Sequence, residues 1–254
     1  MTTNKENAIA VLRSLENGNP SAIQEHVNPS TYIQHNLGFP DGREVMIGAL
    51  KNLKAAGTKV EIKRVLVDGD YVAIHSDYNF FGPKAGFDIF RFEHGQIVEH
   101  WDNLQEKVEI TPSGHTMFDG TTEISDAAKT EENKELVKQF VQDVLMGQNP
   151  EKLTSYFDGD NYIQHNPAIS DGLSGLGAAL EAMAKQGIVM VYDQIHMVLG
   201  QGNFVLAVSE GSFAGVHTSF YDLFRVENGK IAEHWDVMET ILPEEQRKNT
   251  NGKY

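Results

Sequence analysis

The sequence predicts an α+β protein made of two tandem domains, each with helices packed on a mainly antiparallel sheet. The first observation behind this prediction is an internal repeat: YIQHN occurs at 32–36 and 162–166, and EHWD at 99–102 and 233–236. The second is the element order within each copy, in which apolar residues at helical spacing precede strand-like runs. Because the copies are offset by about 130 residues, each has the size of a domain and not of a solenoid unit.

The repeat also predicts the domain boundary. DIFRFEHGQIVEHWD at 88–102 matches DLFRVENGKIAEHWD at 222–236. Between the copies, the stretch TPSGHTMFDGTTEISD is rich in glycine, serine, threonine and aspartate, which is typical of linkers. We therefore expect one domain at 1–125 and a second at 126–254, with a linker at about 107–128.

Local patterns predict the elements of each copy. Ala8, Ile9, Leu12 and Leu15 recur at helical spacing, so the first copy begins with a helix at 7–15. The remaining predicted elements are helices at 21–27 and 44–55, strands at 60–67, 71–80, 87–93 and 96–103, and second-copy helices at 132–146, 150–157 and 174–185. Turn sequences such as DGD and EHG separate the strands, which indicates an antiparallel meander with helices on one face.

Composition excludes several classes of function. The 254 residues carry a net charge of −15, and such a surface repels phosphate backbones, so no nucleic-acid partner is expected. The absence of cysteine excludes disulfides, thiol catalysis and cysteine-ligated zinc. No signal peptide and no run of about 20 apolar residues is recognisable, so the sequence predicts a cytoplasmic protein without a membrane partner.

Strand alternation concentrates ionisable groups in the predicted sheet. Val98, His100 and Asp102 share one face of the last strand, and Asp88 lies in the preceding one. Neither face of the sheet is cleanly polar or apolar, so both faces are expected to be covered. Buried carboxylates are costly unless they are paired or have a task in a cavity, which makes Asp88 and Asp102 candidates for a pocket.

The motifs resemble those of a known family. YIQHNP with a following DG, and then D-[IL]-F-R-x-E-x-G-x-I-x-E-H-W-D, are similar to the SnoaL-like polyketide-cyclase branch of the nuclear transport factor 2-like superfamily. The resemblance covers nearly all of both copies, although the first copy has Leu37 in place of the motif's proline. It implies two cone-shaped domains, in each of which a curved sheet wraps around helices and leaves a deep pocket.

The resemblance also implies roles for particular residues. Family cyclases use a carboxylate near the end of the last strand as a general acid and base without metal, and this position matches Asp102 and Asp236. The YIQHN segment lines the pocket in relatives, which indicates His35 and His165. Because single-copy relatives pair through their sheets, the resemblance implies an intramolecular pseudo-dimer of the two domains, with a homo-oligomer of the chain left open.

These residue types suit an aldol-type ring closure, in which one proton is removed beside a carbonyl and another is delivered to the new alkoxide. The predicted catalytic residues are Asp102, His35, Asp88 and His75 in the first copy and Asp236, His165 and Asp222 in the second. The predicted pocket-lining residues are Tyr32, His100, Trp101, Tyr162, His234 and Trp235. Because Val208 stands where His75 would fall, the first copy is expected to be the better equipped.

Each assignment has a structural alternative. Asp102 could be a hydrogen-bond acceptor only, Asp88 could pair with an arginine, and His35 is as well explained as a buried structural histidine. Both tryptophans, Trp101 and Trp235, are explained by packing alone.

A metal site is the other alternative. Three imidazoles and a carboxylate, from His35, His75, His100 and Asp102, could in principle bind an ion. Because only the last two are closely spaced and the resembled chemistry is metal-free, we expect no metal and no cofactor.

Three functions remain open at this level. The chain is an enzyme acting on a small apolar or polyketide-like molecule, as a cyclase, isomerase or hydrolase; a non-catalytic binding protein for a small apolar ligand; or a scaffold with filled pockets. Fold alone does not choose among them. An enzyme requires a cavity that Asp102 faces, a carrier requires an almost wholly apolar cavity, and a scaffold requires none.

Overall fold

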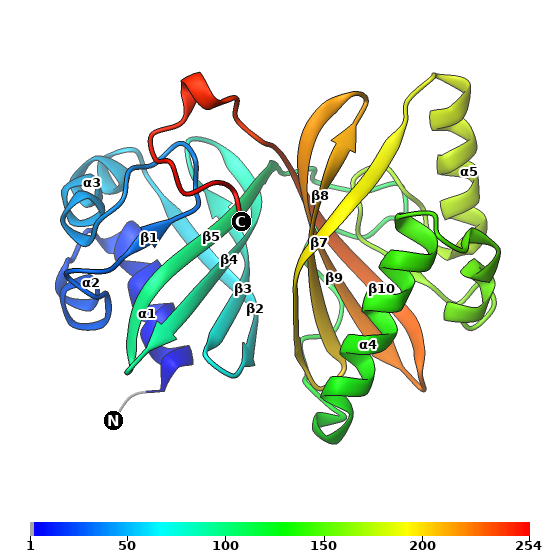
Figure 1. Cartoon of the computed structure of the whole chain (residues 1–254), viewed down its shortest axis with the longest axis horizontal. Coiled ribbons are helices and arrows are strands. Elements are labelled where there is room, and N and C mark those ends of the chain that lie inside the picture. The colour runs from blue at the N-terminus through cyan, green and yellow to red at the C-terminus, as the bar shows by residue number, and fades with distance from the viewer. Residues whose placement is uncertain (1–2) are drawn as a thin grey trace. The chain divides into compact units, whose positions relative to one another are not determined.

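The computed structural model describes residues 3–254, which form two compact units (Figure 1). Unit 1 runs up to Glu106 and also takes in Ile241–Tyr254, whereas unit 2 is Lys107–Thr240. Within residues 3–254, each unit contains a five-stranded sheet with helices on one face, so the predicted α+β class and tandem architecture are confirmed. None of the helices in this range is both long and apolar enough to cross a membrane.

Unit 1 follows the predicted element order. Its elements are α1 (Asn4–Asn17), α2 (Ser21–His26), β1 (Ile33–Gln34), α3 (Arg43–Ala55), β2 (Lys59–Asp68), β3 (Tyr71–Asn79), β4 (Pro83–Glu93), β5 (Gln96–Glu106) and the 3-10 turn η4 (Glu244–Gln246). The strand order β1-β5-β4-β3-β2 combines an antiparallel meander with β1, which runs parallel to β5. β1 is not among the predicted strands, because two residues are too few to show alternation.

The first helix shows how the sequence sets a boundary. The Thr3 hydroxyl accepts from the backbone N–H of Glu6, and the Glu6 carboxylate accepts in return from the backbone of Thr3 at 2.7 Å. This capping box satisfies amide groups that an open helix end would leave unpaired. The helix stops at Gly18, whose φ of 73° is left-handed. Between these ends, Ala8 and Leu12 are buried in the core of unit 1.

Unit 2 repeats the same topology with a looser helix over its sheet. Its elements are η1 (Ala127–Lys129), α4 (Thr130–Phe140), the π-helical turn η2 (Val141–Leu145), η3 (Pro150–Tyr156), β6 (Ile163–Gln164), α5 (Gly172–Lys185), β7 (Met190–Gln201), β8 (Phe204–Phe213), β9 (Val216–Glu227) and β10 (Lys230–Thr240). Whereas α3 buries Met46, Leu50 and Leu53, the only buried residue of α5 is Gly172, all of α5 being described.

The segments that follow β5 and β10 are folded parts of the units. The 107–126 segment belongs to unit 2, where Ser113 Oγ donates to the backbone oxygen of Gln164 at 2.7 Å. The 241–254 segment (red in Figure 1) belongs to unit 1, where Asn251 Nδ2 donates to the backbone oxygen of Gln34 at 3.0 Å. The compact units therefore differ from the predicted halves divided near residue 125, because polar loop residues that resemble a linker bind the folded core.

Candidate functional site

Each unit has a cavity beside its sheet. The unit 1 cavity has a volume of about 80 Å³, and the unit 2 cavity about 330 Å³. Polar residues of the unit 1 lining are Gln34, Asn36, Tyr78, Asp88, His100 and Asp102. Those of unit 2 include Tyr162, Gln164, Asn166, Tyr192, Asp222, His234 and Asp236. Most of the remaining lining is apolar, so each cavity presents one polar wall to an apolar space.

Two aspartates stand side by side on that polar wall. Asp88 of β4 and Asp102 of β5 are cross-strand partners, and Asp222 of β9 and Asp236 of β10 are the equivalent pair. Direct partners in an antiparallel pair point to the same face, so each ladder places two carboxyl groups next to each other. All of these side chains are buried. Asp88 and Asp222 are called the paired aspartates below, and Asp102 and Asp236 the second aspartates.

A histidine of fixed tautomer binds each paired aspartate. In unit 2, Gln164 Oε1 accepts from the backbone N–H of His165 and of Asn166 at 3.0 and 3.1 Å, which identifies it as the amide oxygen. His234 Nδ1 lies 2.9 Å from this oxygen and therefore donates a proton to it. His234 Nε2 then lies 3.0 Å from Asp222 Oδ1, where the two groups share a proton.

Unit 1 builds the same dyad. His100 Nδ1 lies 2.8 Å from Gln34 Oε1, which also accepts from the backbone of Asn36, and His100 Nε2 lies 3.0 Å from Asp88 Oδ1. Because the glutamine oxygen accepts the Nδ1 proton, Nε2 is the ring nitrogen that faces the paired aspartate.

The second aspartates each keep an oxygen available to the cavity. Asn166 Nδ2 donates to Asp236 Oδ2 at 2.6 Å, whereas Asp236 Oδ1 is buried and accepts no hydrogen bond within residues 3–254. Asn36 holds Asp102 in the same way at 2.6 Å. In unit 1, however, the buried ammonium of Lys253 lies 3.8 Å from Asp102 Oδ1 and donates to the Asp102 backbone oxygen at 2.7 Å. Among the described residues, Asp236 Oδ1 therefore has fewer interactions with neighbouring groups than Asp102 Oδ1 has.

A tyrosine completes the polar wall. Tyr78 donates to Asp88 Oδ2 in unit 1, and Tyr192 donates to Asp222 Oδ2 at 3.2 Å in unit 2. Burial, followed by the nearby carboxylate, raises the pKa of both phenols well above its ordinary value. Both phenols therefore remain proton donors at neutral pH.

Burial also shifts the carboxylates. It raises the pKa of Asp236 to about 6, with Asp222 raising it further and the charge of His234 opposing the shift. Burial raises the pKa of Asp88 as well, against hydrogen bonds from His100 and Tyr78 that lower it. An aspartate with a pKa near 6 changes its protonation in the physiological range, as an acid–base catalyst must.

The structure corrects the placement of His35 and His165. Each follows β1 or β6 and lies on the opposite face of the sheet from the carboxylates, stacked on Trp101 or Trp235 at 4.8 and 4.6 Å between ring centroids. His35 Nε2 contacts Glu99 at 2.9 Å, as His165 Nε2 contacts Glu233. Strand alternation is the reason, because Gln34 and Gln164 take the cavity side.

The predicted pocket positions of Trp101 and Trp235 are corrected with them, because both rings belong to that opposite face. His75 also lies away from the cavity. Its neighbour Ile74 is the cross-strand partner of Asp88, so His75 points to the other face and stacks on Phe87 at 4.4 Å. The prediction that the first copy is better equipped for catalysis depends on His75, and it loses this support because His75 does not line the cavity.

Other predicted residues do lie at the cavities. His100, His234 and Tyr162 line them together with the aspartates, and Tyr32 lies in the adjoining hydrophobic core. The sequence interpretation missed the glutamine, asparagine and tyrosine that hold these groups: Gln34, Asn36, Tyr78, Gln164, Asn166 and Tyr192. The repeated YIQHN motif carried the signal for the first two types, since residues on either side of a strand histidine face away from it.

The unit 1 cluster also has the composition of a metal site. Ligand atoms of Asp88, His100 and Asp102 lie within 4.8 Å of one another. The ammonium of Lys253 lies 3.8 Å from Oδ1 of Asp102, one of the three residues of this cluster. Because like charges repel strongly at this separation in a buried site, the residues present do not fit a divalent cation.

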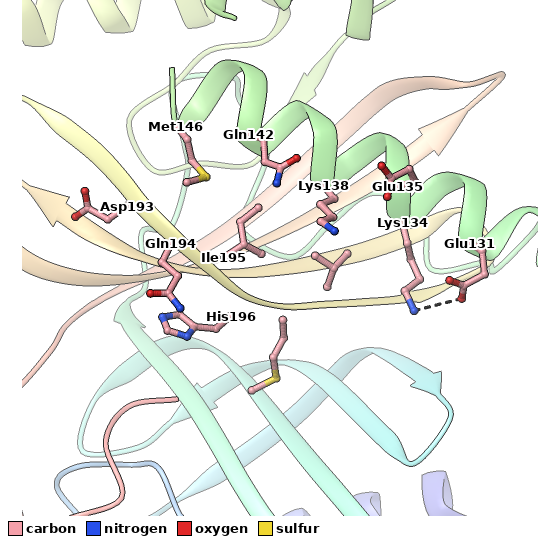
Figure 2. Close-up of a pocket in the computed structure, with 12 residues that line it drawn as sticks. Glu131, Lys134, Glu135, Lys138, Gln142, Met146, Asp193, Gln194, Ile195 and His196 are labelled. Atoms are coloured by element: carbon pink, nitrogen blue, oxygen red, sulfur yellow. Dashed lines mark hydrogen bonds and ion pairs between the residues drawn. The ribbon is translucent and has the colours of Figure 1, made fainter. Parts of the chain in front are cut away.

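Unit 2 has a further groove between α4 and β7 (Figure 2). Its volume is about 530 Å³, and exposed charged residues such as Glu131, Glu135 and Lys138 border it. Lys134 pairs with Glu131 at 3.3 Å, as Figure 2 shows. The cavity beside the unit 2 sheet differs from this groove, because a buried carboxylate oxygen without a hydrogen bond from any described residue, Asp236 Oδ1, lies in its wall. We therefore take that cavity, and not the groove, as the candidate site.

Comparison with known proteins finds a family model for both units. The model of the SnoaL-like domain matches residues 8–100 and 137–234, which together make up most of the chain. No curated protein matches the chain.

Solved structures similar to the chain each cover a part of it. An NTF2-like protein of unknown function from Cytophaga hutchinsonii is 17% identical, with 41% of this chain and 92% of that chain covered and a TM-score of 0.35. IdmH from Streptomyces antibioticus, described as a candidate polyketide cyclase, is 16% identical, with 41% and 93% covered and a TM-score of 0.35. A protein from Catenulispora acidiphila with a ketosteroid isomerase-like fold, in complex with trimethylamine, is 22% identical, with 39% and 85% covered and a TM-score of 0.34.

Proposed function

The chain belongs to the SnoaL-like domain family, and from this premise we propose that it is a small-molecule enzyme whose buried aspartate moves a proton at a carbon next to a carbonyl. Aldol-type cyclisation and isomerisation share this step, and hydrolysis can use the same acid–base pair. The observation that carries the proposal is Asp236: a buried carboxylate with an uncommitted oxygen and a pKa near 6, facing an apolar cavity of about 330 Å³.

Asp236 is suited to act as the base. At neutral pH it is mostly ionised, and it gains little stabilisation from solvent, so its basicity is higher than that of an exposed aspartate. Asn166 holds Oδ2 at 2.6 Å, which leaves Oδ1 for the substrate. Apolar side chains such as Met183 and Met190 line the rest of the space and suit an apolar or polyketide-like molecule.

The dyad supplies the second proton. When Asp236 takes a proton from carbon, the C–H electron pair becomes the enolate, and the negative charge develops on the former carbonyl oxygen. The proton shared by His234 Nε2 and Asp222 Oδ1 stands on the same wall and can pass to that oxygen. In an isomerisation, Asp236 then returns its proton to a different carbon of the enolate, and the oxygen returns its proton to the dyad as the carbonyl re-forms. Both groups are restored, so this cycle needs no outside reagent.

We place the activity in unit 2. The unit 1 cavity is only about 80 Å³, and the Lys253 ammonium lies 3.8 Å from Asp102 Oδ1, the oxygen that a substrate would have to reach. The apolar lining favours one alternative, a binding protein that holds a small apolar ligand without chemistry.

Deuterium exchange separates these functions. The full chain is incubated in D₂O with 2-tetralone, a small bicyclic ketone, and loss of the proton signal next to the carbonyl is followed by NMR. We expect exchange above the buffer rate, its loss in Asp236→Asn, and its retention in the matched control Asp102→Asn. Full exchange by a folded Asp236→Asn variant contradicts the proposal, and binding of the ketone without exchange by the wild type favours the carrier.

A further inference from the structure

The tyrosine that donates to the paired aspartate comes from a different strand in each unit. In unit 1 it is Tyr78 on β3, whose cross-strand partner is Val60 on β2. In unit 2 the position equivalent to Tyr78 is Gly211 on β8, and its cross-strand partner on β7 is Tyr192. The phenol therefore comes from β3 in unit 1 and from the strand equivalent to β2 in unit 2, and in both units it binds the equivalent carboxylate.

A third position changes together with these two. The Tyr78 ring passes close to Gly86 on β4, where an added Cβ would lie 2.9 Å from the ring. The equivalent residue in unit 2 is Phe220 on β9, which stacks on Tyr192 with 4.3 Å between ring centroids. Unit 1 therefore has valine, tyrosine and glycine on three adjacent strands where unit 2 has tyrosine, glycine and phenylalanine.

The two sets cannot be mixed residue by residue. A Cβ at Gly211 would lie 1.9 Å from the backbone oxygen of Val191, so β7 approaches too closely for a tyrosine at that position. A phenylalanine at Gly86 would occupy the path of the Tyr78 ring. The three differences therefore depend on one another, and in both units the result is a phenol that donates a hydrogen bond to the paired aspartate.

We propose that this tyrosine is a positioning residue that keeps the shared proton on the histidine, so that the dyad is an imidazolium–carboxylate pair beside the second aspartate. The inference rests on the proposed function and names the residue that sets the charge state of its proton donor. An O–H donor to a carboxylate forms a strong, charge-assisted hydrogen bond, which stabilises the ionised form. Without the phenol, burial favours the neutral pair, with the proton on the aspartate.

The groups around the unit 2 dyad agree with this role. Asp222 faces His234 and Asp236 from β10 and Tyr192 from β7, while Tyr162 adds a further phenol to the cavity wall. An imidazolium at His234 lowers the pKa of Asp236, against the larger effect of burial. The phenol therefore favours an ionised base and a charged proton donor together, which is the combination that enolate formation requires.

Imidazole ¹⁵N NMR tests the inference without a substrate. The labelled full chain is compared with Tyr192→Phe, and His234 is assigned through His234→Gln. We expect His234 Nε2 to resonate as a protonated nitrogen in the wild type at pH 7 and to lose that signal in Tyr192→Phe. A melting temperature measured for each variant separates this loss from unfolding. If Tyr192→Phe does not fold, Tyr78→Phe gives the same test at His100.

An unchanged Nε2 signal in folded Tyr192→Phe overturns the inference. Because this result does not depend on exchange of the ketone, failure here is distinct from failure of the proposed function.

Discussion

Neutralising Asp236 should stabilise the protein at neutral pH. Burial raises the pKa of this carboxyl from 3.8 to about 6, so the folded state binds the proton more tightly than the unfolded state. The contribution to stability is fully present below pH 3.8 and is lost as the pH rises through 6. A shift of roughly 2 units corresponds to about 3 kcal/mol. Asp236→Asn removes the titration, so its advantage over the wild type should grow by about 3 kcal/mol between pH 3.5 and pH 8.

The assay can be confined to unit 2. Of the two tryptophans, Trp101 lies in unit 1 and Trp235 in unit 2, so a Trp101→Phe background reports unfolding around Trp235. Urea unfolding followed by this fluorescence gives the free energy of unfolding of wild type and variant at each pH. Asp102→Asn is the control, and its unfolding is measured through Trp101 in a Trp235→Phe background. It should lower the free energy of unfolding of unit 1 at neutral pH, because it removes a carboxylate from beside the Lys253 ammonium. A difference between Asp236→Asn and wild type that stays constant from pH 3.5 to pH 8 would refute the reasoning.

Three further predictions concern the residues around the carboxylates. Lys253→Met should lower the stability of unit 1 by about 1–3 kcal/mol through loss of the buried contacts with Asp102, and unfolding reported by Trp235 should not move. Gly211→Ala should destabilise unit 2 by about 1–3 kcal/mol, since its Cβ meets backbone at 1.9 Å, whereas Gly177→Ala on α5 meets open space and should gain about 0.5–1 kcal/mol; urea midpoints decide both. Asn166→Ala releases Asp236 Oδ2 and should slow ketone exchange about 100-fold with little change in melting temperature; an unchanged rate would show that this carboxylate needs no orientation.

The sequence could predict what depends on local periodicity and on the repeat. Helical spacing placed α1 and α3, and alternation placed His100 and Asp102 on one face of β5. Periodicity could not say which face of a sheet borders a cavity, because both faces of β3 and β4 carry apolar and polar residues alike. His75 was assigned to the site for this reason, although its register opposite Phe87 turns it away.

Two features required contacts between distant segments. The 107–126 and 241–254 segments have the composition of loops, and only their hydrogen bonds to Gln164 and Gln34 show to which unit each belongs. The tyrosine exchange is hidden from any position-by-position comparison of the copies, because Tyr78 and Tyr192 do not align. Only the carboxylates that they bind make them equivalent.

The repeated EHWD string joins two separate arrangements through strand alternation. Its glutamate and tryptophan point to one face and hold a histidine of the YIQHN motif between a carboxylate and an indole ring. Its histidine and aspartate point to the other face and line the cavity. The YIQHN segment alternates in register with it, so its histidine joins the first arrangement while its glutamine and asparagine orient the second. A slip of one residue between the two segments would break both arrangements at once, which makes the parallel pairing of β1 with β5, and of β6 with β10, the contact on which the carboxylate geometry depends.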